Sequence, residues 1–477
     1  MAAANGRQAV LAVDQGTSNS KAVLIDAEGA VLASGAAPVR LSTPRPGWVE
    51  QDADDIWRSV LSAVGQALAA ASVEVVGIAL STQRESVAAW SRRTGRAVAP
   101  VIGWQDVRTS DWCSALPESV DALVRSRTGL RVDAMFSAPK LNWLLSRTDP
   151  SDLCVGTVDS WLIQRLTGEH LGEAGNASRT LLYDVVKLDW SDELLEAFGV
   201  PRAVLPEVRP SNAGFGATRG VPGLRDGVPI VAVLADSHAA MYGQGCTRTG
   251  MVKATYGTGS SVMTPIASFE PEDCTLAWLT DRPLYALEGN IVSSGSALAW
   301  TAELLGLPDV RSLIELAATV PDAGDAVLVP AFAGLGAPHW DRNARAAVTG
   351  VSSSTTRAHI ARACVDAVAH QICDITERIG VAGTPNRCLR ADGGASVSDL
   401  LMQTQADLLG HRVEASDIAE LSALGAAELA WSTLGATTGW SERRSLRAFE
   451  PAIDDSSRKQ RRARWADAVA KVLTARD

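Results

Sequence analysis

The first forty residues alternate short apolar runs with polar turns, which is typical of β-strands. The runs are Ala9 to Val13, Lys21 to Asp26 and Val31 to Ala33, and a turn rich in Gly, Thr, Ser and Asn separates the first two. Apolar runs of this length between turn residues predict strands. We therefore expect three short antiparallel strands at the start of the chain.

A helical period follows these strands. From Asp52 onward, apolar side chains recur three or four residues apart, at Ile56, Val60, Leu61, Val64 and Leu68. This spacing predicts an amphipathic helix, and Glu74 to Ser81 then returns to a β-type apolar run. The order of three strands, a helix and a strand indicates a mixed α/β layer fold.

A second hairpin pattern, from Met251 to Thr264, resembles the first. Its two β-type runs flank the turn Gly257-Thr258-Gly259. Before it lies Asp226 to Asp236, a run typical of a buried strand and ending in an acid. Further helices are predicted at 296–305, 356–379, 399–409 and 454–473, and further strands at 326–329 and 388–391. We expect two domains, 1–245 and 246–477, with the boundary near Gly245.

Composition narrows the class of protein. A chain of 477 residues is too long for one ordinary core, and its 46% hydrophobic and 21% charged residues are typical of a globular protein. The formal net charge of -10 argues against nucleic-acid or anionic-membrane binding. Seven cysteines without a C-x-x-C pair indicate neither a disulfide framework nor a zinc site. We find no signal-peptide pattern and no membrane-spanning run, so we expect a cytoplasmic protein.

The two hairpin turns carry candidate chemistry. Phosphoryl transfer needs backbone amides and hydroxyls around the phosphates, a carboxylate for magnesium and a base at the acceptor hydroxyl. In Asp14-Gln15-Gly16-Thr17-Ser18 the glycine permits close backbone approach and two hydroxyls follow it. Each turn alone also fits an ordinary turn, since these residues favour turns. Two such hairpins, each opening an α/β half, favour a nucleotide held between domains.

Two further positions have a structural and a functional interpretation. Asp392-Gly393-Gly394-Ala395 follows a predicted strand, so its backbone could lie flat against a nucleoside, although a Gly-Gly turn is common. Asp236 ends a strand and precedes a helical segment. It fits a helix N-cap, and it equally fits a general base.

The chain resembles the FGGY carbohydrate kinases, and within them most closely the glycerol kinases, over nearly its whole length. Nine collinear blocks carry the resemblance: DQGTSNSK from Asp14, GWVEQD from Gly47, STQRES from Ser81, GWQDVRT from Gly103, TYGTG from Thr255, YALEG from Tyr285, VPAFAGLGAPHW from Val329, ADGGA from Ala391 and LMQTQADLLG from Leu401. The resemblance implies two actin-like, ribonuclease-H-like domains, with ATP and Mg²⁺ in a cleft between them. It implies ATP-dependent phosphorylation of a hydroxyl on a small polyol or sugar.

The resemblance also implies roles for single residues. Asp236 corresponds to the general base and Asp14 to the magnesium-associated acid. The phosphate contacts fall on Thr17, Ser18, Gly257, Thr258 and Gly259, and the adenosine contacts on Gly393, Gly394 and Ala395. Arg84, Glu85 and Trp104 correspond to the residues that bind the hydroxyls and carbon chain of glycerol. These side chains suit a polyol, because Arg donates, Glu accepts and an indole is an apolar wall.

Three positions of the acceptor pocket depart from the glycerol-kinase pattern. Met135 stands where glycerol kinases carry a tyrosine, Ser237 replaces the glutamine after the base, and Ser261 replaces an aromatic residue. Each change removes bulk or a hydrogen-bonding group, so the acceptor can be larger than glycerol. Glycerol is the default acceptor, and the alternative is a tetritol, a pentitol or a ketose of the xylulose or ribulose type.

Two other classes of protein share this fold. A non-kinase or chaperone-like ATPase would not need the polar and aromatic blocks STQRES and GWQD, which favour an enzyme with a small acceptor. A sugar-sensing regulator would carry a DNA-binding extension, and the strand that starts at Ala9 leaves no room for one in front. We therefore expect a small-molecule substrate and no nucleic-acid or membrane partner. A homodimer is the assembly we expect.

Overall fold

The computed structural model describes residues 7–379, 388–418 and 420–474. By contacts the chain divides into two compact units. The first unit comprises Met1–Gly245, Ile266–Ala286 and Glu420–Arg444, and the second comprises Cys246–Pro265, Leu287–Ala419 and Ser445–Asp477. Two stretches of the C-terminal half therefore belong to the first unit. The roles that the sequence suggests for the halves 1–245 and 246–477 stay predictions.

The first unit contains many short elements. Its strands are β1 (Gln8–Gln15), β2 (Asn19–Ile25), β3 (Val31–Pro38), β4 (Glu50–Gln51), β5 (Glu74–Thr82), β6 (Ala88–Ser91), β7 (Val101–Ile102), β8 (Leu153–Gly156), β9 (Leu171–Glu173), β10 (Tyr183–Asp184), β11 (Asp189–Trp190), β12 (Glu207–Arg209), β13 (Ile230–Ala235) and β16 (Cys274–Leu279). Its helices are α1 (Ala53–Ala70), α2 (Ser110–Ser114), α3 (Glu118–Thr128), α4 (Ser137–Leu145), α5 (Val158–Thr167), α6 (Ala174–Ser178), α7 (Asp192–Phe198), α8 (Asp236–Gly243), α13 (Leu421–Thr433) and α14 (Trp440–Arg443). Two 3₁₀ turns, Pro150–Asp152 and Arg202–Val204, complete it.

The second unit has fewer elements. Its strands are β14 (Met251–Tyr256), β15 (Ser260–Ile266), β18 (Val327–Val329), β19 (Ala347–Thr349), β20 (Cys388–Asp392), β21 (Arg412–Ala415) and β22 (Arg447–Phe449). Its helices are α9 (Gly295–Leu304), α10 (Val310–Ala317), α11 (Arg357–Arg378), α12 (Asp399–Leu409) and α15 (Asp455–Ala470), with a 3₁₀ turn at Gly394–Val397. β17 (Pro283–Ile291) begins in the first unit and ends in the second.

The two largest sheets share one topology. The first has the order β13-β5-β1-β2-β3, in which β1 pairs antiparallel with β2 and parallel with β5. The second contains the run β21-β20-β14-β15-β17, in which β14 pairs antiparallel with β15 and parallel with β20. Each half thus opens with a hairpin whose first strand lies beside a parallel strand. This repeat confirms the resemblance between the two hairpin patterns seen in the sequence.

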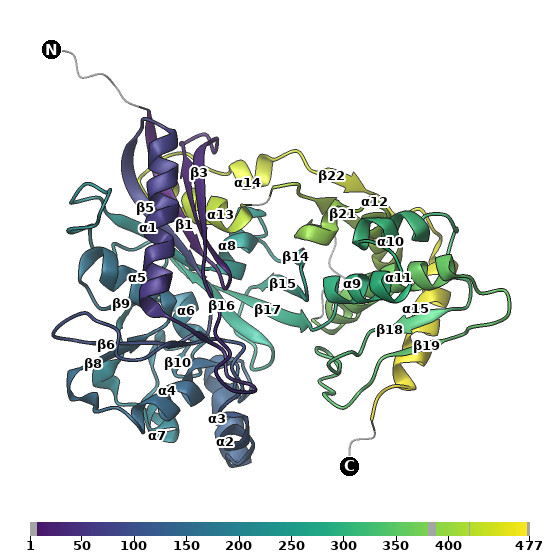
Figure 1. The fold of residues 1–477 in the computed structure, drawn as a ribbon, viewed down its shortest axis with the longest axis horizontal. Helices are drawn as coiled ribbons and strands as arrows, with labels where there is room; N and C mark the ends of the chain where they lie inside the picture. Colours follow the sequence, from purple (N-terminus) through teal and green to yellow (C-terminus); the bar gives the residue numbers. More distant parts are fainter. Residues whose placement is uncertain (1–6, 380–387, 419, 475–477) are drawn as a thin grey trace. The chain divides into compact units, whose positions relative to one another are not determined.

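The alternation of side chains explains how the first sheet is covered. Ala9, Leu11 and Val13 of β1 join one hydrophobic cluster with Ile56 and Val60 of α1, because alternate residues of a strand face the same side. Asp52 caps this helix by accepting a hydrogen bond from the Asp55 amide at 2.9 Å. Figure 1 shows α1 running along β1 and β3.

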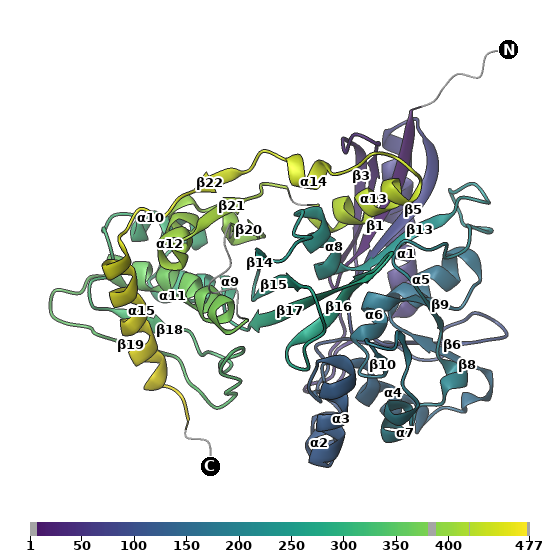
Figure 2. The same ribbon diagram turned by 180° about the vertical axis from the view of Figure 1, so that it is seen from behind.

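Helices α8 and α13 pack closely in the first unit, although they are far apart in the sequence. A β-carbon on Gly425 would come within 1.9 Å of the Ala239 oxygen, and one on Gly243 within 2.4 Å of the Leu421 oxygen. The indole of Trp431 donates to the Ile25 carbonyl at 3.1 Å, which ties α13 to β2. Figure 2 shows α8 and α13 beside each other. Glycine at these positions lets the two helix backbones approach.

Candidate functional site

The β1–β2 turn in the first unit contains two of the predicted phosphate contacts, Thr17 and Ser18. The Gly16 amide donates to the Asn19 carbonyl at 2.9 Å and closes the turn. Thr17 is half-buried and Ser18 is exposed. Hydroxyl and amide groups of this turn are therefore within reach of a ligand.

Asp14 lies at the end of β1, just before this turn. Its carboxylate accepts a hydrogen bond of 2.7 Å from the Ser81 hydroxyl. Burial raises the pKa of Asp14 to about 6, and the negative charge of Asp236 adds to the effect. Lys21 opposes the shift, but it also pairs with Glu420 at 3.0 Å. Asp14 is thus a desolvated acid close to a second carboxylate.

Asp236 is the first residue of α8 and directly follows β13. Ala235, not Asp236, occupies the N-cap position, so the N-cap interpretation of Asp236 is wrong. One carboxylate oxygen accepts from the Ser237 amide at 2.6 Å, and the same oxygen lies 3.6 Å from Nε of Arg84. The carboxylate stays about one-third exposed. Its position at a strand end, next to an arginine and open to solvent, suits a residue that receives a proton from a ligand.

Glu85 combines a strained backbone conformation with a paired carboxylate oxygen. Its φ angle is 61°, in the left-handed region that residues other than glycine rarely adopt. The buried Arg179 donates from Nε to a Glu85 carboxylate oxygen at 2.6 Å, and Nε of Arg84 lies 3.8 Å from the same oxygen. Arg84 therefore lies between the carboxylates of Glu85 and Asp236.

Arg179 was missed by sequence reasoning. It follows a run of small residues, Ala174–Ser178, that forms the short helix α6. An arginine at the end of such a run needs a charged partner if it is buried. An arginine after a run of small residues is thus a signal for a buried ion pair. The sequence does not reveal that the partner is Glu85, 94 positions away.

Trp104, Met135 and Ser237 are the other predicted acceptor residues of the first unit. The Trp104 indole donates to Oγ1 of Thr17 at 2.9 Å, and the side chain remains 36% exposed, so a face of the ring is available to a ligand. The Met135 carbonyl accepts from Nζ of Lys140 at 2.6 Å. Lys140 is fully buried, and burial lowers its pKa to about 7. Ser237, which directly follows Asp236, is half-buried.

The other predicted phosphate contacts and the predicted adenosine contacts lie in the second unit. The Gly257 amide donates to the Gly259 carbonyl at 2.9 Å, and the amide of Ser294 donates to the Thr258 carbonyl at 3.1 Å. A β-carbon on Gly295 would lie 2.5 Å from the Gly257 oxygen, so the start of α9 packs against the turn. Gly295 was not predicted as part of this site.

The two glycines of the Asp392–Ala395 turn have different surroundings. Gly393 has a φ of +92°, and a β-carbon there would lie 2.5 Å from the Tyr256 oxygen. A β-carbon on Gly394 would meet nothing within 4 Å. Gly393 is therefore required by the fold, whereas Gly394 leaves an open backbone surface for a ligand. Ser261, predicted for the acceptor pocket, lies in β15, and its buried hydroxyl has no hydrogen-bond partner among the described residues.

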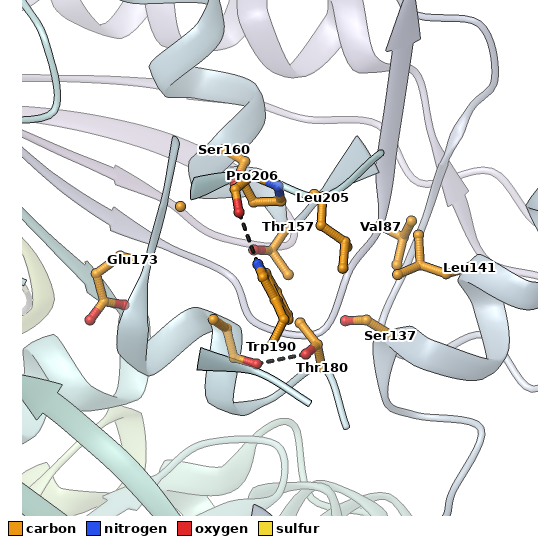
Figure 3. Close-up of a pocket in the computed structure, with 13 residues that line it drawn as sticks. Val87, Ser137, Leu141, Thr157, Ser160, Glu173, Thr180, Trp190, Leu205 and Pro206 are labelled. Carbon is orange, nitrogen blue, oxygen red and sulfur yellow. Dashed lines mark hydrogen bonds between the residues drawn. The ribbon is translucent and has the colours of Figure 1, made fainter. Parts of the chain in front are cut away.

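A small cavity lies elsewhere in the first unit (Figure 3). Its volume of about 10 Å³ is close to the space one water molecule needs. Ser137, Ser160, Glu173, Thr180 and Trp190 are among its lining residues, and none of the predicted acceptor residues is. The Ser160 hydroxyl is buried and lacks a partner in the described part of the chain. The cavity suits a buried water and is too small for a polyol.

Comparison with known proteins identifies the family. The model of the FGGY carbohydrate kinase N-terminal domain covers residues 9–243, and that of the C-terminal domain covers residues 252–434. The chain belongs to the FGGY family of carbohydrate kinases. It has the two actin-like, ribonuclease-H-like domains of that family, as the sequence predicted.

Individual FGGY kinases resemble the chain over its whole length. An apulose kinase from Pectobacterium atrosepticum is 42% identical over 97% of this chain and 98% of its own. A glycerol kinase from Alkalilimnicola ehrlichii is 43% identical over 98% of both chains. The crystal structure of Plasmodium falciparum glycerol kinase with ADP is 28% identical, covers 98% of this chain and 99% of its own, and superposes with a TM-score of 0.91.

No group of three or more His, Cys, Asp or Glu side chains in 7–379, 388–418 and 420–474 is arranged to hold a metal ion. No helix in that part of the chain is both long and apolar enough to cross a membrane.

Proposed function

We propose that this FGGY kinase transfers the γ-phosphoryl group of ATP to a hydroxyl of a small polyol or sugar, with Asp236 as the general base. The observation that carries the proposal is the arrangement of Asp236, Arg84 and Glu85 at one end of the first sheet. Nε of Arg84 lies 3.6 Å from Asp236 and 3.8 Å from Glu85. Two carboxylates and a guanidinium at these distances can accept from and donate to the hydroxyls of one acceptor.

In this mechanism each side chain has one task. Glu85 accepts a hydrogen bond from an acceptor hydroxyl, and its pairing with Arg179 fixes its orientation. The face of Trp104 packs against the carbon chain. Asp236 takes the proton of the attacking hydroxyl as its oxygen bonds to the γ-phosphorus, and the bond from that phosphorus to the bridging oxygen of ADP breaks. Positioning and charge stabilisation account for most of the catalysis in such transfers.

Mg²⁺ fits the carboxylates of the first unit. Magnesium prefers oxygen ligands, keeps several waters, and is usually bound by one or two carboxylates together with substrate phosphates. Asp14 would hold it or its water shell, and a cation there would relieve the cost of a buried carboxylate whose pKa is raised to about 6. The ion would supply positive charge next to the phosphates.

The nucleotide would be ATP, as expected from the kinase family and from the ADP-bound glycerol kinase structure. The proposed phosphate contacts are Thr17 and Ser18 in the first unit and Gly257, Thr258 and Gly259 in the second. Gly394 offers an exposed backbone for the adenosine, with Gly393 and Ala395 on either side. Cytoplasmic location and a homodimeric assembly remain predictions from the sequence.

A second candidate is an acceptor larger than glycerol, such as a five-carbon ketose. Two observations favour it. Met135 and Ser237, next to Lys140 and Asp236, carry no ring or amide of the kind that the glycerol-kinase pattern has there. An apulose kinase is also 42% identical to the chain over almost its full length. One lost or added group in a pocket changes specificity by about 1 to 3 kcal/mol, which is enough to exchange one acceptor for another.

Acceptor-dependent ADP formation tests both candidates. The acceptors are glycerol, erythritol, xylitol, xylulose, ribulose and a branched pentulose, each with Mg·ATP. We expect ADP only when an acceptor is present, a higher kcat/KM for a five-carbon ketose than for glycerol, and a shift of about 10- to 100-fold toward glycerol in Met135→Tyr.

Met135→Leu is the matched control, since it keeps the volume of the side chain and should keep the order of acceptors. ADP formation at the same rate without any acceptor would contradict a kinase and favour the ATPase alternative. An unchanged order of acceptors in Met135→Tyr would contradict the role of Met135.

A further inference from the structure

Five residues of the first unit form a closed ring of hydrogen bonds, which we call the amide ring. The Trp104 indole donates to Oγ1 of Thr17 at 2.9 Å, and the Trp104 amide donates to Oγ of Ser86 at 3.0 Å. Ser86 donates to the side-chain oxygen of Gln83 at 2.9 Å, and Gln83 donates to that of Gln51 at 3.0 Å. Gln51 donates to the Thr17 carbonyl at 2.8 Å, which closes the ring.

The ring is buried and supported from β1. Gln51 and Gln83 are each only 1% exposed, and Ser86 is fully buried. Gln83 donates a second hydrogen bond, of 3.0 Å, to the side chain of the buried Gln15, which in turn donates to the Gly16 carbonyl at 2.7 Å. Buried amides are costly unless they are paired, and a fully paired network is rigid. Gln83 thus holds the turn residues on both sides of the Gly16–Thr17 peptide.

Two residues of the amide ring have roles in the proposed reaction. One belongs to the proposed phosphate site and the other to the proposed acceptor pocket. Thr17 is the proposed phosphate contact, and Trp104 is the proposed wall of the acceptor pocket. Thr17 accepts the indole N–H through its hydroxyl oxygen, so its own proton remains available for a phosphate oxygen. An acceptor that fixes the indole therefore also fixes the direction in which the Thr17 hydroxyl donates.

We propose that Gln51, Gln83 and Ser86 are positioning residues that couple acceptor binding at Trp104 to phosphate binding at Thr17. The proposal rests on the proposed function, since it uses the roles given there to Thr17 and Trp104. If the amide ring only stabilised the fold, a substitution that removes one of its hydrogen bonds would lower the melting temperature of the protein. A network that couples two sites changes how each ligand affects the affinity for the other, and the two effects are equal by linkage.

The experiment measures the dissociation constant of Mg·AMP-PNP by titration calorimetry without and with saturating acceptor. The two acceptor probes are glycerol and xylulose, and the one that supports faster ADP formation is used. We expect the acceptor to tighten AMP-PNP binding about 5- to 50-fold in the wild type. In Gln83→Met, which keeps the shape but removes the amide, and in the milder Ser86→Ala, this factor should fall close to one.

Thr128→Val is the matched control. It removes another buried hydroxyl of the first unit, which donates to the Val124 carbonyl at 2.8 Å and has no bond to the ring. It should lower the melting temperature and keep the coupling factor. Ser86→Ala keeps the test decisive if Gln83→Met fails to fold.

Two results would overturn the proposal and are distinguishable. If the wild type forms ADP with an acceptor and both variants keep its coupling factor, the ring is only structural and the proposed function stands. If the wild type forms no ADP with any acceptor of the panel, the proposed function fails, and the coupling fails with it.

Discussion

Asp14 illustrates how a residue suited to function lowers the stability of the free protein. Its pKa in the folded chain is about 6, above the ordinary value of 3.8, chiefly because it is buried. The unfolded chain therefore releases this proton near pH 4 and the folded chain only near pH 6. Stability falls as the pH rises through this window, since the folded state then binds more protons than the unfolded state.

Asp14→Asn should therefore stabilise the ligand-free protein above pH 6, by about 1 to 3 kcal/mol, and should make no difference below pH 4. Denaturation by urea at pH 4, 5, 6, 7 and 8 measures this. Glu28→Gln, at an exposed acid next to the same sheet, is the control for the removal of a carboxylate. A difference between Asp14→Asn and the wild type that does not vary with pH would contradict the raised pKa. Asp14→Asn should also lose the stabilisation that Mg·ATP gives to the wild type.

At the level of single residues, the sequence suggested candidate groups but not their pairings. Asp14, Glu85 and Asp236 were named from strand ends, turns and a family resemblance. The Arg179–Glu85 pair and the amide ring were not predicted, because they join residues far apart in the sequence that carry no periodic signal. A left-handed φ at Glu85 is likewise set by tertiary contacts and cannot be predicted from its residue type.

At the level of elements, the close contact of α8 with α13 decides where Asp236 lies. Gly425→Ala would place a β-carbon 1.9 Å from the Ala239 oxygen and 2.6 Å from the Gly243 amide nitrogen. These are backbone atoms, so the helices must separate. We expect a loss of about 1 to 3 kcal/mol in spite of the better helix propensity of alanine. kcat should fall as well, since α8 begins with Asp236.

Gly65→Ala provides the contrast, because a β-carbon there in α1 meets nothing within 4 Å. It should stabilise the protein by about 0.5 to 1 kcal/mol without an effect on kcat. Thermal melting and steady-state rates of both variants measure the difference. Similar melting temperatures for the two would show that α8 and α13 do not need their close approach.

The elements themselves were largely predictable. The strands of both hairpins, the helix capped by Asp52 and the long helix α11 were all predicted from apolar periodicity and turn residues, and the structure confirms them. The stretch from 100 to 225 contains mostly short strands and helices, such as α2 with five residues. Elements this short contain too few residues for a period of 2 or 3.6 to be visible.

At the scale of the whole molecule, the two units alternate along the chain. Ile266–Ala286 and Glu420–Arg444 belong to the first unit although the sequence placed them in the second half. The second of these stretches begins with Glu420, which pairs with Lys21, and contains α13, which packs on α8. Such an assignment depends on contacts between distant segments, so neither composition nor periodicity could supply it. The resemblance of the two hairpins predicted the repeat, but not this exchange of segments.

The central claim is that Asp236 takes the proton of an acceptor hydroxyl during transfer from ATP. The most direct test is a single-turnover measurement of phosphoryl transfer from ATP to the best acceptor of the panel, in the wild type and in Asp236→Asn. We predict that Asp236→Asn binds Mg·ATP as tightly as the wild type and transfers the phosphoryl group about 10³-fold more slowly. Transfer at a rate near that of the wild type would contradict the claim.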